Sequence, residues 1–330
     1  MGVGHDTYRI GNLENMEKHS KIYVAGHKGL VGSAIVRLLI AKGYDNIIIR
    51  SHAELDLSIQ AEVEAFFNKE KPEYVFLAAA KVGGIGANST YPAEFFYQNM
   101  TIALNVIDAS YKFGVTKLLN LGSSCIYPRM APQPLKEEYL LTGPLEPTNE
   151  AYALAKIAAI RMCRHYNEEY GTNFLSVMPT NMYGPGDNYD LFSSHVLPAM
   201  IRKFHEAKRS GMEVVLWGDG SPLREFLHVD DCAVAVVMLM EKFNYQDIGE
   251  LINIGSGTEL AIMTLADLMA DVVGYSGLIR WDREKPNGTP RKLLDSSKLF
   301  SIGWKPTIPL RMGLQRSYAE FLSSRLENDR

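Results

Sequence analysis

The sequence predicts an α/β fold built on a doubly wound parallel sheet, and three observations support this. Short apolar strands alternate with helical segments between residues 21 and 178. These strands are apolar along almost their whole length, as strands are when helices cover both faces of a parallel sheet. A glycine-rich turn joins the first strand to the first helix. We therefore expect ligands to bind outside the carboxyl ends of the strands.

The elements of this part follow one another in a regular order. β-rich apolar runs predict strands at residues 21–26, 47–50, 74–78, 117–121 and 174–178. Helical segments are expected between them at residues 34–41, 63–69, 103–113 and 150–170. Glycines mark the ends of three of these helices, at Gly43, Gly114 and Gly171.

The alternation changes after Gly184, where the turn residues of 184–188 gather. A helix at 196–207, an isolated strand at 214–217, a helix at 233–243 and a strand at 251–254 are expected next. We therefore predict an N-terminal extension, a larger domain and a smaller, mostly C-terminal one. Their expected residues are 1–20 for the extension, 21–184 plus about 225–257 for the larger domain, and about 185–224 plus 258–330 for the smaller one.

Composition limits the classes of partner. The formal net charge of −4 argues against a nucleic-acid binder, which usually has a basic face. The longest apolar run, 232–240, is too short to cross a membrane, and residues 1–20 lack the pattern of a signal peptide. The three cysteines, Cys125, Cys163 and Cys232, form no CxxC pair, which predicts free thiols in a reducing, cytoplasmic compartment. No histidine has zinc-ligand spacing, so no metal site is expected.

The glycine-rich turn has the pattern G-x-x-G-x-x-G and lies between a predicted strand and a predicted helix. Glycines there permit a tight turn and close approach of a pyrophosphate, while the helix N-terminus offers amide groups and partial positive charge. Lys28 adds a full positive charge. This context favours a Rossmann-type dinucleotide site over a mere tight turn, with a loop made of Gly26, His27, Lys28, Gly29, Leu30, Val31 and Gly32.

The end of the second strand predicts which dinucleotide binds. NAD enzymes usually place an acid there, whereas a cation suits the 2′-phosphate of NADP. Here the strand ends in Arg50, Ser51 and His52, and the arginine can donate two parallel hydrogen bonds to a phosphate. The alternative is that Arg50 is a solvated surface charge. The nearby acid Glu54 also makes the choice between NAD and NADP less clear. We predict NADP, with Asp56 and Leu57 near the adenine.

Tyr152 and Lys156 form a Y-x-x-x-K pair on the long helix 150–170. Residues four apart share a helix face, and an ammonium group lowers the pKa of a neighbouring phenol. Such pairs also arise by chance. The serine-containing loop after the fourth strand supports a function here, because Ser123 would lie at the carboxyl edge of the sheet beside Tyr152.

Taken together, these motifs resemble the extended short-chain dehydrogenase/reductases that modify nucleotide sugars. The resemblance extends over most of the chain from Lys21. Among these enzymes it is greatest to the 3,5-epimerase/4-reductases of GDP-4-keto-6-deoxy-mannose. Besides the glycine turn and the Tyr-Lys pair, it is carried by residues 122–128 (GSSCIYP), 145–150 (LEPTNE), 178–185 (MPTNMYGP), 194–196 (SHV), 217–218 (WG), 224–230 (REFLHVD) and 288–295 (GTPRKLLD).

The resemblance implies a role for each matching residue. Ser123, Tyr152 and Lys156 match the family's reductive triad, and Cys125 and His195 match its epimerisation base and acid. The remaining cofactor positions would be Leu121, Gly122, Ser124, Pro179, Thr180, Asn181 and Met182, with His195. The GDP-sugar would be held by Lys203, Trp217, Arg224, Arg291 and Asp295. One departure is His52, which stands where the family can carry an arginine for the 2′-phosphate.

The implied reaction is C3 and C5 epimerisation followed by NADPH-dependent reduction at C4, which gives GDP-L-fucose. One alternative is another nucleotide-sugar epimerase, reductase or dehydratase, but a dehydratase would usually show Thr-Asp or Thr-Glu where Ser124 and Cys125 stand. A non-catalytic dinucleotide-binding protein would be expected to lack part of the triad. The helices 102–113 and 150–170 carry apolar residues on more than one side, which predicts a homodimer interface unless these faces only pack on the sheet.

Overall fold

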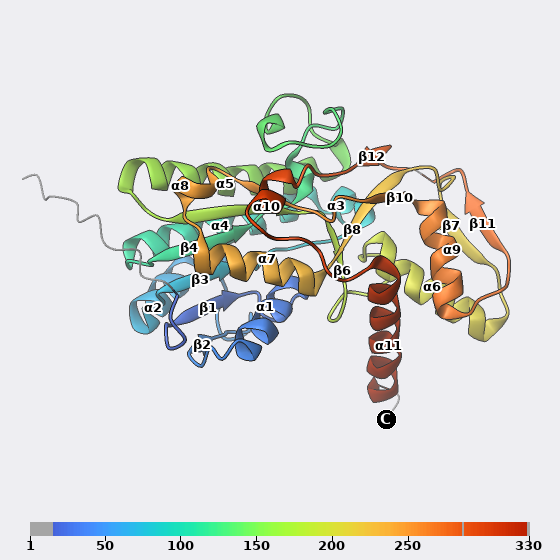
Figure 1. The fold of residues 1–330 in the computed structure, drawn as a ribbon, viewed down its shortest axis with the longest axis horizontal. Coiled ribbons are helices and arrows are strands. Elements are labelled where there is room, and N and C mark those ends of the chain that lie inside the picture. The colour runs from blue at the N-terminus through green and yellow to red at the C-terminus, as the bar shows by residue number, and fades with distance from the viewer. Residues whose placement is uncertain (1–15, 286, 329–330) are drawn as a thin grey trace, which may run out of the picture.

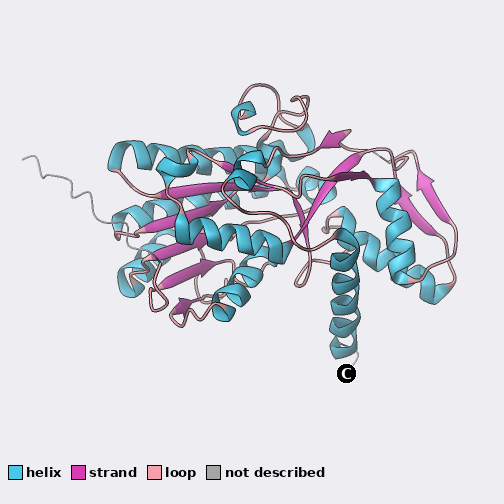
Figure 2. Ribbon diagram, viewed as in Figure 1, coloured by secondary structure: helices cyan, strands magenta, loops and turns pink. Residues whose placement is uncertain are grey.

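The structure, a computed structural model, describes residues 16–285 and 287–328. Most of the predicted extension, residues 1–15, lies outside the described residues. A six-stranded parallel sheet occupies the larger part of the molecule, with the strand order β2-β1-β3-β4-β5-β9 (Figures 1 and 2). Its strands are β1 (Ile22–Ala25), β2 (Ile47–Ile48), β3 (Tyr74–Leu77), β4 (Lys117–Leu121), β5 (Phe174–Pro179) and β9 (Ile252–Ile254). The predicted fold class is therefore confirmed.

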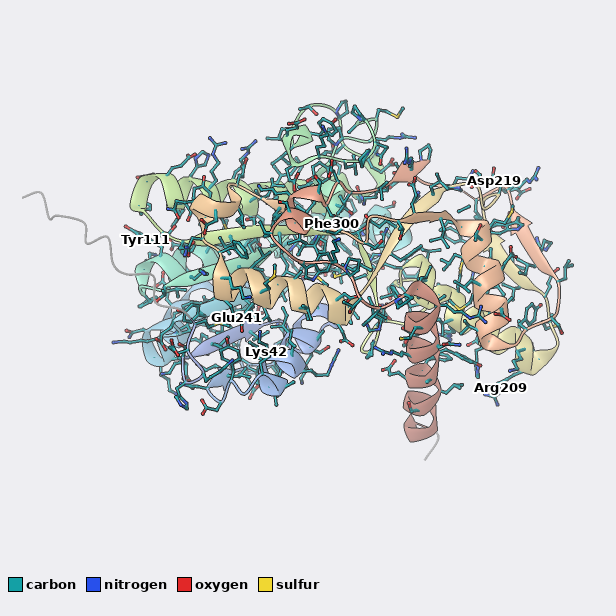
Figure 3. The ribbon with its side chains drawn as sticks, viewed as in Figure 1. Lys42, Tyr111, Arg209, Asp219, Glu241 and Phe300 are labelled. Carbon is teal, nitrogen blue, oxygen red and sulfur yellow. The ribbon has the colours of Figure 1, made fainter. Side chains whose placement is uncertain are left out.

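Helices cover both faces of this sheet. On one face, α1 (Leu30–Ala41) and α7 (Val229–Lys242) bury their apolar residues against the strands. On the other face lie α2 (Gln60–Glu70), α4 (Pro92–Lys112) and α5 (Glu150–Tyr170). The ends of α1 and α7 are joined by an ion pair of 2.6 Å between Lys42 and Glu241 (Figure 3).

Several helices begin earlier than the apolar pattern predicted. Helix α1 begins at Leu30 rather than residue 34, because the last glycine of the turn, Gly32, already lies inside the helix. Helix α4 begins at Pro92, about ten residues early, with the proline in its first turn, where its missing N–H costs no hydrogen bond. A short helix, α3 (Ile85–Thr90), precedes it and was not predicted.

Strand β2 is shorter than predicted. It ends at Ile48, so Ile49 and Arg50 lie outside the sheet ladder. Its register on β1 pairs Ile22 with Ile47 and Tyr23 with Ile48. The side chain of Arg50 consequently belongs to the loop that follows the strand.

The smaller part of the chain holds two further sheets. In the first, β8 (Leu223–His228) lies between β10 (Glu259–Ala261) and β12 (Arg291–Lys292), and β6 (Asn181–Tyr183) also pairs with β8. In the second, β7 (Val214–Trp217) pairs in parallel with β11 (Ile279–Asp282). The prediction that 214–217 is an isolated strand was therefore wrong. Its partner comes some sixty residues later, and no local pattern marks that pairing.

Three longer helices accompany these sheets. Helices α6 (Val196–Ser210), α9 (Ile262–Val273) and α11 (Leu310–Asn328) pack around one apolar core. The short helices α8 (Tyr245–Ile248) and α10 (Ser297–Ser301) lie beside strands β5 and β9 of the large sheet, respectively. Strand β5 leads through Thr180 directly into β6, so the chain passes from the large sheet to the smaller one within two residues. This places the carboxyl ends of β4 and β5 beside the strands of the second sheet.

Candidate active site

The glycine turn is shaped by contacts that exclude side chains. Gly26 has φ +83°, and a Cβ atom there would lie 2.6 Å from the backbone nitrogen of Ala79. A Cβ atom on Gly32 would lie 2.1 Å from the carbonyl oxygen of Gly26. The first turn of α1 contains no acidic residue, and Lys28 is exposed beside it. The turn thus leaves a helix N-terminus open to an anion, as a dinucleotide pyrophosphate requires. The ring atom Nδ1 of His27 is shielded from solvent and has no protein partner.

The residues after β2 are engaged with protein groups. The Arg50 guanidinium forms an ion pair of 2.8 Å with Glu70, and it also donates to the carbonyl of Ile49. The Ser51 hydroxyl and amide both donate to Glu54, which lowers the pKa of that carboxyl. His52 is exposed, with Nδ1 3.8 Å from Asp56. The cation predicted after β2, Arg50, is therefore present, but it already forms an ion pair with Glu70.

The two predicted adenine neighbours occupy different environments. Asp56 accepts hydrogen bonds from the amide and hydroxyl of Ser58, which lower its pKa. Leu57 is buried in the core on the α2 side of the sheet, and its carbonyl accepts from Asn105. The Leu57 side chain is therefore part of the core beneath the expected adenine site and not part of its surface.

Helix α5 and the loop after β4 bring the predicted triad together. The Lys156 ammonium lies 5.8 Å from the centroid of the Tyr152 ring and donates to the carbonyl of Leu121 at 2.8 Å. Burial lowers the pKa of Lys156 to about 8, while nearby Cys125 raises it slightly. Burial raises the pKa of Tyr152, and the charge of Cys125 adds to this, whereas a hydrogen bond from Ser123 lowers it. Ser123 therefore contacts the phenol that would exchange a proton.

The two predicted epimerisation residues, Cys125 and His195, are both close enough to Lys292 for its charge to act on them. Cys125 is buried in a short 3-10 turn, where burial raises the pKa of its thiol and the Lys292 ammonium is the largest influence that lowers it. His195 precedes α6 and is exposed at the surface. Protein atoms that surround part of its ring lower its pKa, and Lys292 lowers it further. One part-buried cation, Lys292, thus acts on both groups.

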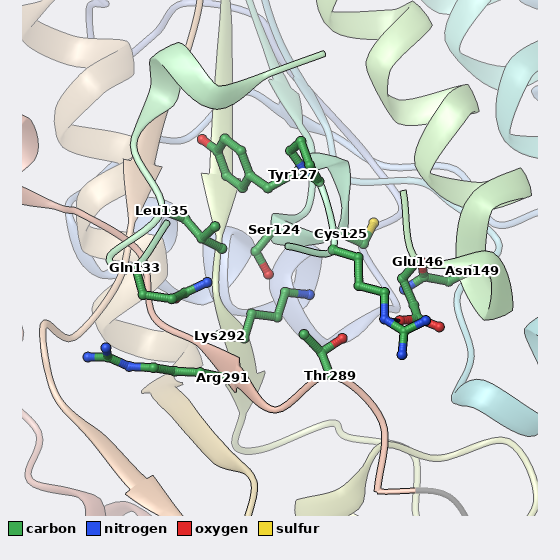
Figure 4. Close-up of a pocket in the computed structure, with 12 residues that line it drawn as sticks. Ser124, Cys125, Tyr127, Gln133, Leu135, Glu146, Asn149, Thr289, Arg291 and Lys292 are labelled. Carbon is green, nitrogen blue, oxygen red and sulfur yellow. Dashed lines mark ion pairs between the residues drawn. The ribbon is translucent and has the colours of Figure 1, made fainter. Parts of the chain in front are cut away.

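Cys125 opens into a pocket between the two parts of the chain. Its walls come from the loop after β4, from the segment before α5 and from residues 289–292 (Figure 4). Besides Cys125, the side chains that line it include Lys292, Glu146 and Asn149 (Figure 4), as well as Arg129. Shielded oxygen atoms of Glu146 and Asn149 have no hydrogen-bond partner, although Arg129 lies 3.2 Å from Glu146. Such groups suit a ligand rich in hydroxyls.

The segment after β5 connects this region to β8. Pro179 ends the strand, and Thr180 is buried with its amide bonded to the carbonyl of Ile254. The Asn181 side chain donates to the carbonyl of Glu225 at 2.8 Å, while Met182 packs on the α1 and α7 core. On the β4 side, a Cβ atom on Gly122 would lie 2.3 Å from Met178, so the two strand ends approach closely.

The predicted GDP-sugar residues are not all in one place. Lys203 and Trp217 line a second, more open cavity beside α6 and β7, with the Lys203 ammonium bonded to the carbonyl of Val215. Arg224 is part-buried on β8, and Arg291 lines the first pocket while pairing with Glu259 at 2.6 Å. Asp295 lies beyond the residues that line either pocket and instead accepts the amide of Ser297 at the start of α10.

Sequence reasoning missed part of the pocket wall. Lys292, Thr289, Arg129, Glu146 and Asn149 line it, but none was singled out. Four of them, Glu146, Asn149, Thr289 and Lys292, belong to segments that carry the family resemblance, LEPTNE and GTPRKLLD. Only the fold shows that these segments, more than a hundred residues apart, face one thiol.

This arrangement suits two kinds of proton transfer beside a nucleotide site. The Cys125 thiol lines the pocket, the charge of Lys292 acts on this thiol and on the His195 imidazole, and a phenol with an ammonium group lies near the thiol. Among the described residues, no cluster of three or more His, Cys, Asp or Glu side chains could hold a metal ion. No helix in the described part of the chain is both long and apolar enough for a membrane span.

Comparison with known proteins places the chain among close relatives. Residues 22–255 match the NAD dependent epimerase/dehydratase family. The chain is 58% identical to GDP-L-fucose synthase 1 of Arabidopsis thaliana over 309 residues, which cover 93% of this chain and 95% of that protein. It is 50% identical to GDP-L-fucose synthase of Escherichia coli strain K12, covering 92% and 97% of the two chains. A GDP-L-fucose synthetase from Naegleria fowleri, solved with NADP bound, superposes with a TM-score of 0.87 at 28% identity, covering 95% and 97%.

Proposed function

This chain belongs to the NAD-dependent epimerase/dehydratase family, and we propose that it converts GDP-4-keto-6-deoxy-mannose into GDP-L-fucose. The observation that carries the proposal is the joint placement of two proton-handling pairs. Cys125 and His195 both face Lys292, and Tyr152 with Lys156 lies beside Cys125. Identities of 50% and 58% to GDP-L-fucose synthases support the same reaction.

We propose NADP as the cofactor, and the residues of the glycine turn fit it. The positions where Cβ atoms would clash, Gly26 and Gly32, leave backbone amides exposed to the pyrophosphate, and Lys28 adds charge. Arg50, Ser51 and His52 would hold the 2′-phosphate once Glu70 and Glu54 yield part of their contacts. When bound, NADPH supplies a hydride to C4 of the sugar.

The epimerisation would use the two groups that share Lys292. The C4 ketone makes the protons on C3 and C5 acidic, because the electron pair of the broken C–H bond moves into an enolate. We propose that the Cys125 thiolate takes the proton, which forms an S–H bond, and that the His195 imidazolium gives its proton to the opposite face of the carbon. Exchange with solvent then returns Cys125 to the thiolate and His195 to the imidazolium before the next centre reacts.

The reductive step would use the triad. Tyr152 is placed to give a proton to O4 as the ketone becomes an alcohol, and Ser123 contacts the same phenol. The Lys156 ammonium stabilises the phenolate that remains, since an opposite charge favours the ionised form. In this proposal, residues 21–184 with about 225–257 bind NADP, and about 185–224 with 258–330 bind the GDP-sugar.

The test separates the two chemistries with two variants. Cys125→Ser replaces a thiol that ionises near pH ~8.5 with a hydroxyl that barely ionises, so it should abolish deuterium exchange from solvent into C3 and C5. Tyr152→Phe should retain this exchange and reduce NADPH oxidation by ~100-fold or more. NMR of the sugar and NADPH absorbance measure the two steps. Near wild-type formation of GDP-L-fucose by Cys125→Ser would refute the assignment of the base.

We also propose a homodimer in the cytoplasm. Helices α4 and α5 pack side by side, and beyond the residues that pack on the sheet they leave Tyr97, Leu104, Tyr111 and Leu154 exposed by 67, 46, 39 and 41%. The three buried free cysteines are consistent with a reducing compartment. Light scattering at micromolar concentration should give a dimer mass, and the double change Leu104→Glu with Leu154→Glu should lower it to that of a monomer.

A further inference from the structure

Lys292 reaches the reacting groups from an element that carries none of the predicted catalytic residues. It lies on β12 and points into the pocket toward the turn that holds Ser124 and Cys125 (Figure 4). Its neighbour Arg291 lies at the edge of the same pocket, but its guanidinium is paired with Glu259. Because successive side chains of a strand alternate in direction, the register of β12 decides which of these two cations meets the thiol.

That register is held by a fully buried carboxylate. Strand β12 pairs Arg291 with Leu223 and Lys292 with Arg224 of β8. The next residue of β8, Glu225, is 0% exposed and accepts the amide of Leu294 at 3.0 Å and that of Gly257 at 2.8 Å. Gly255 must be a glycine for this contact, since a Cβ atom there would lie 2.5 Å from the carboxylate. Three chain segments are thus tied together directly behind Lys292.

The groups around the Lys292 ammonium act on its charge in opposite directions. Burial lowers the pKa of Lys292 and the neighbouring Arg224 adds to this, whereas Cys125 and Glu146 act to raise it. On the Cys125 side, the facing groups are Lys292 from β12, Ser123 from its own turn, and Tyr152 and Lys156 from α5. The Lys156 ammonium already donates to the carbonyl of Leu121, whereas no hydrogen bond from the Lys292 ammonium is found within the described residues.

We propose that Lys292 is a further catalytic residue of the C3 and C5 epimerisation, where its ammonium group stabilises the Cys125 thiolate. The inference rests on the proposed function for its role in turnover. Lys292 keeps its proton throughout: the C–H bond breaks, the S–H bond forms, and the ammonium remains beside the enolate. The same charge makes protonated His195 a stronger acid, so one cation assists both the removal and the return of the proton.

The experiment measures Cys125 itself, without substrate. Alkylation of the full-length protein by iodoacetamide is followed against pH, with the modified peptide quantified by mass spectrometry. We compare Lys292→Met and Lys292→Gln, which remove the charge, with Lys292→Arg, which keeps it. Lys69→Met, which removes an exposed lysine on α2, is the matched control.

The expected result is an apparent pKa of Cys125 at least about one unit higher in the uncharged variants, hence a rate of alkylation about tenfold lower at pH 8. Lys292→Arg should stay within a few-fold of wild type and Lys69→Met should not differ. Deuterium exchange at C3 and C5 should fall in parallel while the affinity for NADPH is unchanged. If the uncharged variants titrate like wild type, the proposal is wrong. If wild type catalyses no exchange, the proposed function fails, and the alkylation data still decide whether Lys292 stabilises the thiolate.

Discussion

Replacing Lys156 with methionine removes the positive charge of the side chain but keeps nearly the same length, so it tests what the charge contributes. The ammonium lies 5.8 Å from the centroid of the Tyr152 ring, over which the charge of a phenolate is spread. At an effective dielectric constant of ~20, two unit charges at that distance attract by about 3 kcal/mol. This corresponds to roughly two pKa units of the phenol and so to ~100-fold in its acidity as the proton donor. We expect kcat for NADPH oxidation to fall by about that factor.

The assay must keep cofactor binding from hiding this effect. NADPH is held at saturation, so that any lost contact between Lys156 and the cofactor appears in KM and the lost charge appears in kcat. In the wild type, kcat/KM should decline as pH rises through about 8, because the Lys156 ammonium is lost there. The methionine variant should lack this decline, while deuterium exchange at C3 and C5 continues.

Two results would refute the reasoning. A fall in kcat of less than about threefold would mean that the solvent or the substrate, not Lys156, balances the charge on Tyr152. An equal loss of deuterium exchange and of NADPH oxidation would mean that Lys156 serves both steps through Cys125, whose thiol it also influences.

Three other changes test Arg50 in the cofactor site, Glu225 behind strand β12, and the part-buried acid Asp187. Arg50→Ala should weaken NADPH binding much more than NADH binding, by on the order of 1.5–3 kcal/mol for a charge-assisted contact, as measured by titration calorimetry; equal losses would place the 2′-phosphate elsewhere. Glu225→Gln should lower the free energy of unfolding by about 1–3 kcal/mol in urea melts, because the amide group cannot accept from both Leu294 and Gly257. Burial raises the pKa of Asp187 to about 7, and Glu320 adds to this. Since the unfolded carboxyl titrates near 3.8, the folded state loses stability as pH rises from about 4 to 7. Asp187→Asn should therefore unfold at higher temperature than wild type at pH 8 and at the same temperature at pH 4, and parallel pH profiles would contradict this.

The fold class could be predicted from the sequence, because the evidence for it lies in short, contiguous segments. Apolar strands that alternate with helices predict a covered parallel sheet, and the glycine turn marks the nucleotide end of it. The resemblance named Ser123, Cys125, Tyr152 and Lys156, and these meet at the carboxyl end of β4. Each lies on a loop or helix whose position in such a sheet follows from chain order.

Contacts between residues far apart in the sequence became known only from the three-dimensional structure. Arg50 was predicted as a phosphate ligand, but Glu70, twenty residues later, shares its charge. Strand β7 pairs with β11, and Asp295 accepts a hydrogen bond from the first residue of α10. Lys292 faces Cys125 from the other end of the chain because β12 pairs with β8 in one register. Pairings of this kind depend on packing between segments far apart in sequence, and no local pattern encodes them.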